Sequence, residues 1–328
     1  MRVGLLGAGW IAESHVAHIQ AADDADLVAV CDLDADRAGV VAGPAAAIYG
    51  DWEQMLERES LDALWVCTPP LHHRAPTIIA LERGIHVYLE KPIARDLADG
   101  EAIVAAAESS HAVCAVGYMW RGTELLQRAR ESVALDHVAM LVSRNYGPVA
   151  GRGWFMDRAQ SGGQILERAS HHIDLQRAIA GDVTAVQASG ATIPLAQFGA
   201  AGGTGLGIED ALAIVLHFAS GAEGTISVAW TAPGQPHVHA LDVLDHQATL
   251  SLRLGPGRFE LHGHAGGAAI HGSYGDPMRR SVQRFLTAAR RGDKTAVFCT
   301  PRDAQGTLKV AVSCEAALAG GNTVHVPV

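Results

Sequence analysis

The first third of the chain alternates short apolar runs with longer stretches whose apolar positions have helical spacing. We expect strands at Val3–Leu6, Leu27–Cys31, Ala63–Cys67, His86–Leu89 and Val113–Gly117. We expect helices between them at Ile11–Ala21, Ala35–Val41, Trp52–Arg58, Ala75–Arg83 and Ala98–Ser109. This alternation predicts β–α–β units and a doubly wound parallel sheet.

The pattern changes near Trp120–Arg121. A helix at Glu124–Glu131, a strand at His137–Asn145, a Gly-rich loop and a helix from about Gln164 to Ala180 are expected there. Long apolar β runs follow, with turns such as Ser220-Gly221 between them, and these predict a largely antiparallel sheet. The further strands are expected at Ala185–Ser189, Leu212–Phe218, Gly224–Trp230, Val238–Leu244 and Ala248–Leu254.

Two domains are therefore expected. Residues 1–120 form the doubly wound α/β domain, and residues 121–328 form an α+β domain on a largely antiparallel open sheet. Gly199–Gly207 is expected to be a mobile loop, because apolar sheet patterning continues on both sides of it. With 328 residues, 48% of them hydrophobic and 18% charged, the chain has enough apolar material to be globular throughout.

Charge and cysteine content exclude several classes of protein. The 25 basic and 35 acidic residues give a net charge of −10, which disfavours nucleic acid or an anionic membrane as a partner. The five scattered cysteines without C-x-x-C spacing suggest neither a disulfide framework nor a thiolate zinc site. The chain enters a strand at Val3 without a signal segment, and it has no uncharged apolar run of about 18 residues. We expect a soluble cytoplasmic protein.

A glycine-rich turn joins the first strand to the first helix. The residues Gly7-Ala8-Gly9-Trp10-Ile11-Ala12 match G-x-G-x-x-A, in which the glycines allow a tight turn and close approach of a pyrophosphate to the backbone. The helix N-terminus then faces the anion with free N–H groups. Asp32 ends the second strand, where a carboxylate can accept a hydrogen bond from the ribose 2′-hydroxyl and would repel a 2′-phosphate. These features predict a Rossmann domain that prefers NAD to NADP.

Other readings of this turn remain open. It could be an ordinary strand–helix turn with glycines for packing, or the turn of a methyltransferase, whose second strand also ends in an acid. Arg37 could accept a 2′-phosphate, or it could pair with Asp34 or face solvent.

The residues after the next two strands are candidates for the cofactor pocket, because ligands bind at the carboxyl ends of strands in open α/β sheets. Thr68-Pro69-Pro70-Leu71-His72 forms a rigid turn after one strand, and Glu90-Lys91-Pro92 follows the other. Lys91 is either a catalytic or substrate-orienting ammonium or a surface lysine paired with Glu90.

These motifs together resemble the Gfo/Idh/MocA family of nicotinamide-dependent oxidoreductases. In that family the lysine of E-K-P lies between nicotinamide and substrate, a role that the resemblance assigns to Lys91. The residues expected to contact the cofactor are Gly7, Gly9, Trp10, Ile11, Asp32, Arg37, Thr68, Pro69, His72, Glu90 and Lys91.

A helix in the second half carries three polar residues on one face. Glu167, His171 and Asp174 stand at i, i+4 and i+7 after the paired glycines Gly162-Gly163. Such a line could exchange protons through the imidazole, or it could be a solvated polar face. Zinc binding is disfavoured because H-E-x-x-H and a cysteine ligand are lacking, so no metal is expected.

The resemblance gives this helix a role, since family members commonly carry G-G-x-x-x-D-x-G-x-H-x-x-D here. It makes His171 the general acid/base, Glu167 its carboxylate partner, and Asp174 a residue of the substrate pocket. Glu167 and Ala169 depart from the family's Asp and Gly, so the substrate pocket is expected to differ from those of sugar and inositol dehydrogenases.

The resemblance covers most of the chain. It includes Trp154 ahead of the paired glycines, Arg121 where the chain leaves the cofactor domain, and a late helix at Ala304–Leu318 before Val324–Val326. Trp154 and Arg121 are expected near the substrate.

The other histidines carry no expected function. The pairs His237/His239 and His262/His264 would each project to one face of a strand, where they could bind a metal, but we expect surface residues. His15, His18, His73 and His172 are also expected on the surface of helices or turns.

The sequence thus predicts an NAD(P)-dependent dehydrogenase that acts on the CH–OH group of a polyol, cyclitol or sugar-like alcohol. A non-catalytic NAD-binding sensor and a methyltransferase are the alternatives. The open sheet and the resemblance predict a homodimer or homotetramer formed through the C-terminal sheet.

Overall fold

The structure is a computed structural model that describes residues 1–124, 126–127, 137–148, 154–192, 208–231, 237–246, 248–255, 258–265, 268–273 and 275–327. The chain divides into two compact units. Unit 1 contains Met1–Gly122 and Pro277–Gln305, and unit 2 contains Thr123–Asp276 and Gly306–Val328. The expected division at residue 120 differs in one respect, because it places Pro277–Gln305 in the second domain, whereas these residues belong to unit 1.

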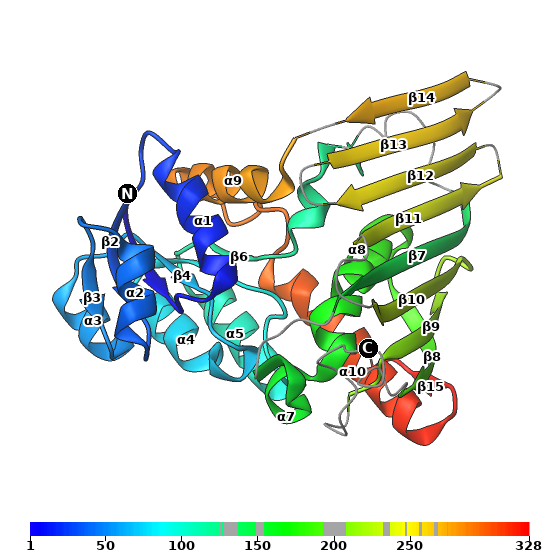
Figure 1. Ribbon diagram of the computed structural model, residues 1–328, viewed down its shortest axis with the longest axis horizontal. Coiled ribbons are helices and arrows are strands. Elements are labelled where there is room, and N and C mark those ends of the chain that lie inside the picture. Colours follow the sequence, from blue (N-terminus) through cyan, green and yellow to red (C-terminus); the bar gives the residue numbers. More distant parts are fainter. Residues whose placement is uncertain are drawn as a thin grey trace. The chain divides into compact units, whose positions relative to one another are not determined.

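Unit 1 is built on a six-stranded parallel sheet in the order β3-β2-β1-β4-β5-β6 (Figure 1). The strands are β1 Arg2–Leu6, β2 Asp26–Cys31, β3 Ala47–Tyr49, β4 Ala63–Val66, β5 His86–Leu89 and β6 Cys114–Val116. The helices are α1 Trp10–Gln20, α2 Ala35–Ala42, α3 Trp52–Arg58, α4 Arg74–Glu82, α5 Leu97–Ser109 and α9 Pro277–Arg291. The predicted parallel sheet is confirmed. Its strand order reverses between β1 and β4, where ligands of such sheets bind.

The helices of unit 1 begin in two different ways. The carboxylates of Asp34, Asp51 and Asp96 accept hydrogen bonds from the first N–H groups of α2, α3 and α5, as side-chain caps do. Gly9 precedes α1, and no side chain among the described residues caps that helix. The start of α1 can therefore receive an anionic ligand where α2, α3 and α5 have a side-chain cap.

Helix α9 belongs to unit 1 because its apolar face completes the core. Phe285 packs edge-on against Trp65 of β4 and Tyr88 of β5, with ring centroids 5.0 and 5.6 Å away. Trp65 and Tyr88 themselves stack at 5.4 Å. Buried positions recur along α9 with helical spacing, namely Met278, Val282, Phe285, Leu286 and Ala289.

Unit 2 contains a nine-stranded sheet in the order β14-β13-β12-β11-β7-β10-β9-β8-β15. Only β7 and β10 pair in parallel within this described sheet, so the predicted, largely antiparallel sheet is confirmed. The strands are β7 Val138–Pro148, β8 Val183–Ala191, β9 Ala211–Phe218, β10 Glu223–Thr231, β11 Val238–Asp245, β12 Ala248–Gly255, β13 Arg258–Ala265, β14 Ala268–Ser273 and β15 Val324–His325.

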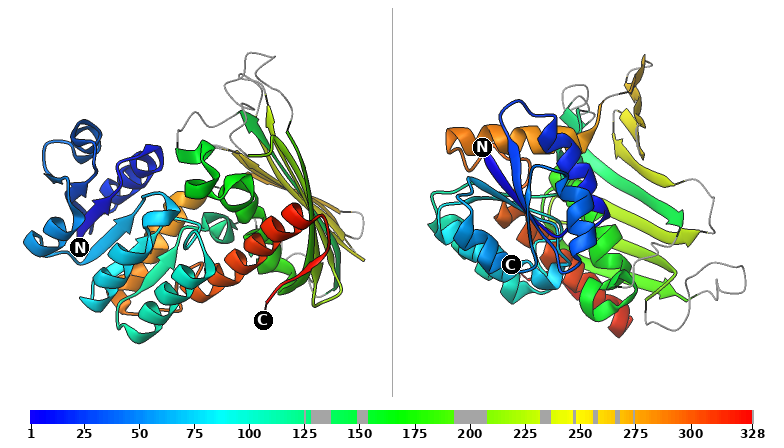
Figure 2. Two further views of the ribbon diagram at one scale, coloured as in Figure 1. Left: turned by 90° about the horizontal axis from the view of Figure 1, so that it is seen from below. Right: turned by 60° about the vertical axis from the view of Figure 1, so that its left-hand side comes forward.

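Two helices cover one face of this sheet. Helix α8 (Ser170–Ala180) and the part of α10 (Pro301–Gly320) that belongs to unit 2 lie on the same side, as Figure 2 shows. Gln176 of α8 donates hydrogen bonds to Ser143 Oγ of β7 at 2.9 Å and to the Thr225 carbonyl of β10 at 3.0 Å. These bonds fix α8 against the centre of the sheet.

Some expectations fall partly or wholly outside the described residues. These are most of the helix expected at Glu124–Glu131 and the loop expected at Gly199–Gly207. Over the described parts of the chain, no helix combines the length and the apolar character needed to cross a bilayer. A cytoplasmic location stays a prediction.

Candidate active site

The turn after β1 has the backbone that the glycine motif predicts. Gly7 has φ +92°, and a Cβ there would lie 2.8 Å from the backbone carbonyl of Cys67, so only glycine fits this position. Gly9 has φ −77°, and no atom of the described residues lies within 4 Å of where its Cβ would be. The first glycine thus serves the fold, whereas the second keeps open the space that a pyrophosphate would approach.

Asp32 lies beside this turn at the end of β2. Its Oδ2 accepts the N–H of Ala8 at 2.7 Å, and its Oδ1 accepts the N–H of Asp34 at 2.9 Å. Arg37 reaches Asp32 Oδ1 and Asp34 Oδ2, each at 3.1 Å. Arg37 therefore pairs with both acids in this structure. Pairing with Asp34 is one of the alternatives that the sequence leaves open for Arg37.

The turns after β4 and β5 are linked by a buried imidazole. Nε2 of His73 lies 2.8 Å from the Thr68 carbonyl, and its Nδ1 lies 3.0 Å from the Pro92 carbonyl. Burial lowers the pKa of His73, although its backbone contacts partly oppose this shift. The neutral ring holds one N–H, which joins one of these carbonyls according to the tautomer.

His73, rather than its neighbour His72, is the residue that organises this part of the sheet. His73 is fully buried, whereas His72 is exposed. The expectation that His73 lies on the surface is wrong, because the short helix at Pro70–His72 turns the following side chain inward. A cofactor contact for His72 stays a prediction.

Glu90 is held by a second buried histidine. Nε2 of His15 on α1 lies 2.7 Å from Glu90 Oε1, and both side chains are buried. Burial raises the pKa of Glu90, but hydrogen bonding to His15 and the nearby charges outweigh it, so that the net pKa is lowered. Gly117 leaves the necessary room, because a Cβ there would lie 2.9 Å from Glu90 Oε1.

Lys91 follows as the next residue and is partly exposed. Its backbone N–H donates to Glu90 Oε2 at 3.0 Å, and its peptide bond to Pro92 is cis. The Glu90 carboxylate therefore holds the backbone that carries the lysine. Glu90 itself is bonded to α1, the helix that begins at the glycine turn.

The second group of predicted residues begins with a distorted helix in unit 2. Gly162 and Gly163 have φ of +73° and +68°, which favours glycine. Ile165–Ala169 then forms a π-helix that continues directly into α8. The expected single α-helix from about Gln164 to Ala180 is therefore wrong in its first turns. π-Helical turns occur often at functional sites.

Glu167 lies within the π-helix, and His171 lies in the first turn of α8. Glu167 is buried and His171 is partly exposed. A π-turn has more residues than an α-turn, so the spacing that the α-helical pattern assumed for these two side chains does not hold across the junction. Their pairing stays a prediction.

Asp174 is buried among groups of unit 2. Its Oδ1 accepts the Thr307 hydroxyl at 2.9 Å, and Thr307 Oγ1 accepts from Arg177 Nη1 at 2.9 Å. Gly306 gives the Arg177 guanidinium its space, since a Cβ would lie 2.3 Å from it. This network joins α8 to α10.

Arg121 and Trp154, the other predicted substrate contacts, lie in different units. Arg121 pairs with Asp303 at 3.4 Å within unit 1. Burial raises the pKa of Asp303, but Arg121 and the Thr300 hydrogen bonds outweigh this and lower it overall. Trp154 packs on Phe155, which in turn contacts Trp230 of β10.

Several histidines are buried where exposure was expected. His15 and His172 are fully buried, like His73. His239 is partly buried, and His237 is exposed. For His15 and His172 the missed signal is their position on the buried face of their helices. The side chains of His262 and His264 lie outside those that the structure describes.

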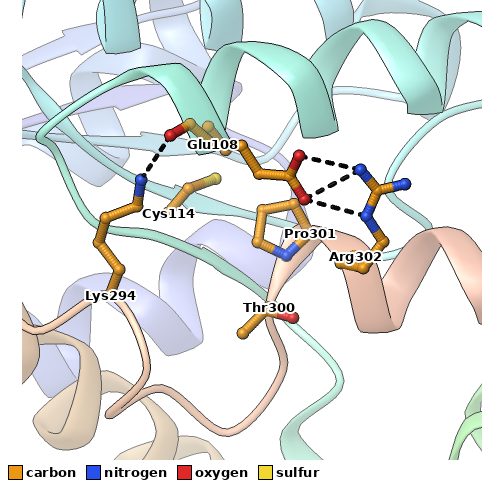
Figure 3. Close-up of a pocket in the computed structure, with 7 residues that line it drawn as sticks. Glu108, Cys114, Lys294, Thr300, Pro301 and Arg302 are labelled. Atoms are coloured by element: carbon orange, nitrogen blue, oxygen red, sulfur yellow. Dashed lines mark hydrogen bonds and ion pairs between the residues drawn. The ribbon is translucent and has the colours of Figure 1, made fainter.

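Unit 1 contains a cavity of about 210 Å³ whose lining includes none of the predicted site residues (Figure 3). It adjoins Cys114, the first residue of β6, whereas the glycine turn and Lys91 follow the carboxyl ends of their strands. Lys294 donates to the Glu108 and Ser110 carbonyls, and Arg302 pairs with the Glu108 carboxylate. Both cations of the cavity are thus engaged by the protein.

The residues of unit 1 fit a dinucleotide. The space at Gly9 and the uncapped start of α1 suit a pyrophosphate. Asp32 can accept from a ribose hydroxyl. Thr68 Oγ1 is buried and has no hydrogen-bond partner in the described part of the chain, so it can bond a ligand. Among the described residues, no group of three or more His, Cys, Asp or Glu could hold a metal ion.

Two family models match successive parts of the chain. Residues 1–118 match the model of an oxidoreductase family with an NAD-binding Rossmann fold, and residues 126–269 match the GFO/IDH/MocA C-terminal domain. Myo-inositol 2-dehydrogenase of Thermotoga maritima is 28% identical over 69% of this chain and 67% of its own length. D-Glucoside 3-dehydrogenase of Escherichia coli is 27% identical over 67% and 68%.

Solved structures show the same fold. A levoglucosan dehydrogenase in complex with NADH superposes with a TM-score of 0.84 at 18% identity, over 100% of this chain and 99% of that one. The chain belongs to the Gfo/Idh/MocA oxidoreductase family, and it is an NAD(P)-dependent dehydrogenase.

Proposed function

We propose that the protein oxidises a secondary alcohol of a polyol, cyclitol or sugar-like substrate, and that it prefers NAD to NADP. The relatives named above act on inositol and glucosides, which supports this class of substrate. Asp32 at the end of β2 supports the cofactor preference. NAD, when bound, supplies the acceptor for the hydride.

The observation that carries the proposal is the connection from α1 to Lys91. His15 of α1 holds Glu90 at 2.7 Å, and Glu90 holds the backbone N–H of Lys91 at 3.0 Å. The residue with the ammonium group is therefore fixed to the helix whose N-terminus suits the dinucleotide. An ammonium in this position can donate a hydrogen bond to the substrate oxygen and stabilise charge that develops there.

His171 completes the proposed chemistry as general acid/base. During oxidation it accepts the hydroxyl proton of the substrate, and during reduction it returns that proton. Glu167 would orient its ring. Trp154 would contact the substrate, as would Arg121 and Asp174 in addition to their bonds to Asp303 and Thr307.

A screen for NADH formation over sugars, polyols and cyclitols, run in parallel with NADP, tests the proposal. We expect oxidation of at least one of these alcohols with a higher kcat/KM for NAD. NADH binding, followed by fluorescence, without oxidation or reduction of any member of the panel would indicate the non-catalytic sensor instead. Binding of S-adenosylmethionine in place of NADH would indicate a methyltransferase.

We also propose that the sheet of unit 2 associates with a second copy of the chain. The helices of this unit lie on one face of the sheet (Figure 2), and the other face has no helix of unit 2 on it among the described residues. Light scattering of the purified protein should give the mass of a dimer or tetramer, and a monomer at micromolar concentration would contradict this.

A further inference from the structure

One cation inside unit 2 is not used by the proposed chemistry. The guanidinium of Arg168, in the π-helix, donates to Asn145 Oδ1 at 2.7 Å. Its other contacts are longer, at 3.2 Å to Gln164 Oε1 and 3.4 Å to the carbonyls of Ala229 and Asn145. All of these acceptors are neutral oxygens.

Arg168 has no acidic partner in the part of the chain that the structure describes. No carboxylate there lies within ion-pair distance of it, and its Nε–H has no hydrogen-bond partner there. Burial lowers the pKa of Arg168 to about 10, so the group still carries its charge near neutral pH. Charges with little access to water are ordinarily paired with an opposite charge, and this partly buried one is not.

Three imidazoles line the space next to Arg168. The ring of His172 stacks on that of His239 at 6.2 Å, and His239 stacks on His237 at 6.3 Å. Burial lowers the pKa of His239 to about 4, with Arg168 and His237 contributing, and burial also lowers the pKa of His172 well below its ordinary value. The rings of His172 and His239 are therefore neutral at pH 7, and they add hydrogen-bonding groups without adding charge.

The cluster reaches the surface of unit 2. His172 is buried, His239 is partly buried and His237 is exposed, so the stack runs inward from solvent. Gly147 of β7 accommodates its outer end, because a Cβ there would lie 2.7 Å from His237 Nδ1 and 3.4 Å from Arg168 Nη2. His237 and the Arg168 guanidinium thus pack directly against the main chain of β7 at Gly147.

The cluster also lies close to the proposed acid/base along the helix. Arg168 lies in the π-helix, His171 follows three residues later in the first turn of α8, and His172 of the cluster comes directly after His171. The proposed acid/base and the cluster are therefore carried by one continuous helical segment.

We propose that Arg168, with His237 and His239, binds a carboxylate of the substrate, which makes the substrate a polyhydroxy carboxylic acid such as a uronate or aldonate. This inference rests on the proposed function, and it narrows the substrate class. The carboxylate supplies the negative charge that Arg168 lacks, and the Nε–H and the imidazoles supply donors to its two oxygens.

The charge of the cluster favours a carboxylate over a phosphate. Arg168 contributes one positive charge, which a monoanion neutralises, whereas a sugar phosphate near its dianionic state would leave a buried negative charge. Neutral sugars would leave the guanidinium without a counter-ion.

The first test compares matched substrates in NADH formation: D-glucuronate with D-glucose, D-galacturonate with D-galactose, and D-gluconate with D-sorbitol, with D-glucose 6-phosphate as a phosphate arm. We expect the acids to have kcat/KM values about tenfold or more above their neutral counterparts. Equal values, or a preference for the phosphate, would overturn the inference. Oxidation of neutral members alone would leave the proposed function standing, whereas oxidation of none would remove it.

The second test uses Arg168→Gln with Arg144→Gln as the matched control. Arg144 is the neighbour of Asn145 on β7 and pairs with Asp242 at 3.0 Å, away from the cluster. The acid-to-neutral ratio of kcat/KM should fall about tenfold or more in Arg168→Gln and stay unchanged in Arg144→Gln. An unchanged ratio in a folded Arg168→Gln protein would overturn the inference.

A third measurement uses the wild-type protein, so its result does not depend on whether a variant folds. In the wild-type protein, D-glucuronate should shift the imidazole NMR signals of His237 and His239 and raise the pKa of His239 above about 4, because a bound anion favours the imidazolium. D-Glucose is the control. The absence of a shift with D-glucuronate at a concentration that saturates turnover, or equal shifts with D-glucose, would contradict the proposed site.

Discussion

His15 on α1 and Glu90 at the end of β5 form a buried pair, with Nε2 and Oε1 2.7 Å apart. The pair connects the helix that starts the dinucleotide site to the turn that carries Lys91. Because the pKa of Glu90 is lowered, its stabilising effect is present above the pKa of an unfolded glutamate, near 4.3, and is lost as the pH falls through the folded value.

Replacing one member of this pair should destabilise the protein. His15→Ala leaves a buried carboxylate without its partner, and we expect the free energy of unfolding at pH 7 to fall by about 3 kcal/mol or more. Urea denaturation followed by circular dichroism measures this. The double variant His15→Leu with Glu90→Gln should recover part of the loss, since no charge is then left unpaired. A loss below about 0.5 kcal/mol for His15→Ala would contradict the role of the pair.

The two glycines of the β1–α1 turn should respond differently to alanine. Gly7→Ala places a side chain at φ +92° and 2.8 Å from the Cys67 backbone, and it should cost about 2 kcal/mol or more of stability. Gly9→Ala meets no described atom within 4 Å, so its stability should change by less than about 0.5 kcal/mol. Its affinity for NADH, measured by fluorescence, should nevertheless fall about tenfold or more. Tight NADH binding by Gly9→Ala would show that the pyrophosphate does not approach this turn.

Asp32 should determine the choice of cofactor. Asp32→Ala removes the acceptor for the ribose hydroxyl and one of the two acids that hold Arg37 at 3.1 Å. The guanidinium is then able to turn toward a 2′-phosphate. We expect the NAD-to-NADP ratio of kcat/KM to fall about tenfold or more. Adding Arg37→Gln should reverse the gain with NADP, and an unchanged ratio in Asp32→Ala would place the adenosine ribose elsewhere.

The parallel sheet, the glycine turn and Asp32 could be predicted because each depends on local pattern. Strands with contiguous apolar residues, and a turn that only glycine can form, leave a direct record in the sequence. The return of Pro277–Arg291 to unit 1 was not predicted. Its apolar spacing marks a helix, but the core that this helix joins, at Trp65 and Tyr88, is about 200 residues away in sequence.

The partners of the buried histidines could not be predicted for a related reason. What a buried imidazole contacts depends on a residue distant in sequence, such as Glu90 for His15 or the Pro92 carbonyl for His73. The π-helix that precedes α8 also depends on contacts with residues distant in sequence. It accompanies the contacts of Arg168 with two different strands, which no helical periodicity records.

Acid should weaken unit 2 through its imidazole stack. The pKa of His239 is lowered from 6.5 to about 4, and that of His172 is lowered as well, so the unfolded chain binds protons that the folded chain excludes. Stability is therefore full above about pH 6.5 and falls as the pH drops toward 4, by up to about 1.4 kcal/mol per pH unit for each histidine. The free energy of unfolding, measured by urea denaturation at several pH values, should depend less on pH over this range in His239→Gln than in wild type. The exposed His111→Gln serves as control, and identical slopes for wild type and His239→Gln would contradict the prediction.

Lys91 and His171 should be separable from cofactor binding. Lys91→Ala removes the ammonium that would stabilise the substrate oxygen, and His171→Ala removes the proton acceptor, so turnover should fall about 100-fold or more in each. The Kd for NADH should change by less than about threefold, because the pyrophosphate and ribose contacts remain. Lys309→Ala, at a partly exposed position on α10, should keep full turnover. Steady-state kinetics and NADH titration of the same preparations decide the matter. Unchanged turnover in Lys91→Ala or His171→Ala would remove that residue from the mechanism, and loss of NADH binding in step with turnover would reassign it to the cofactor site.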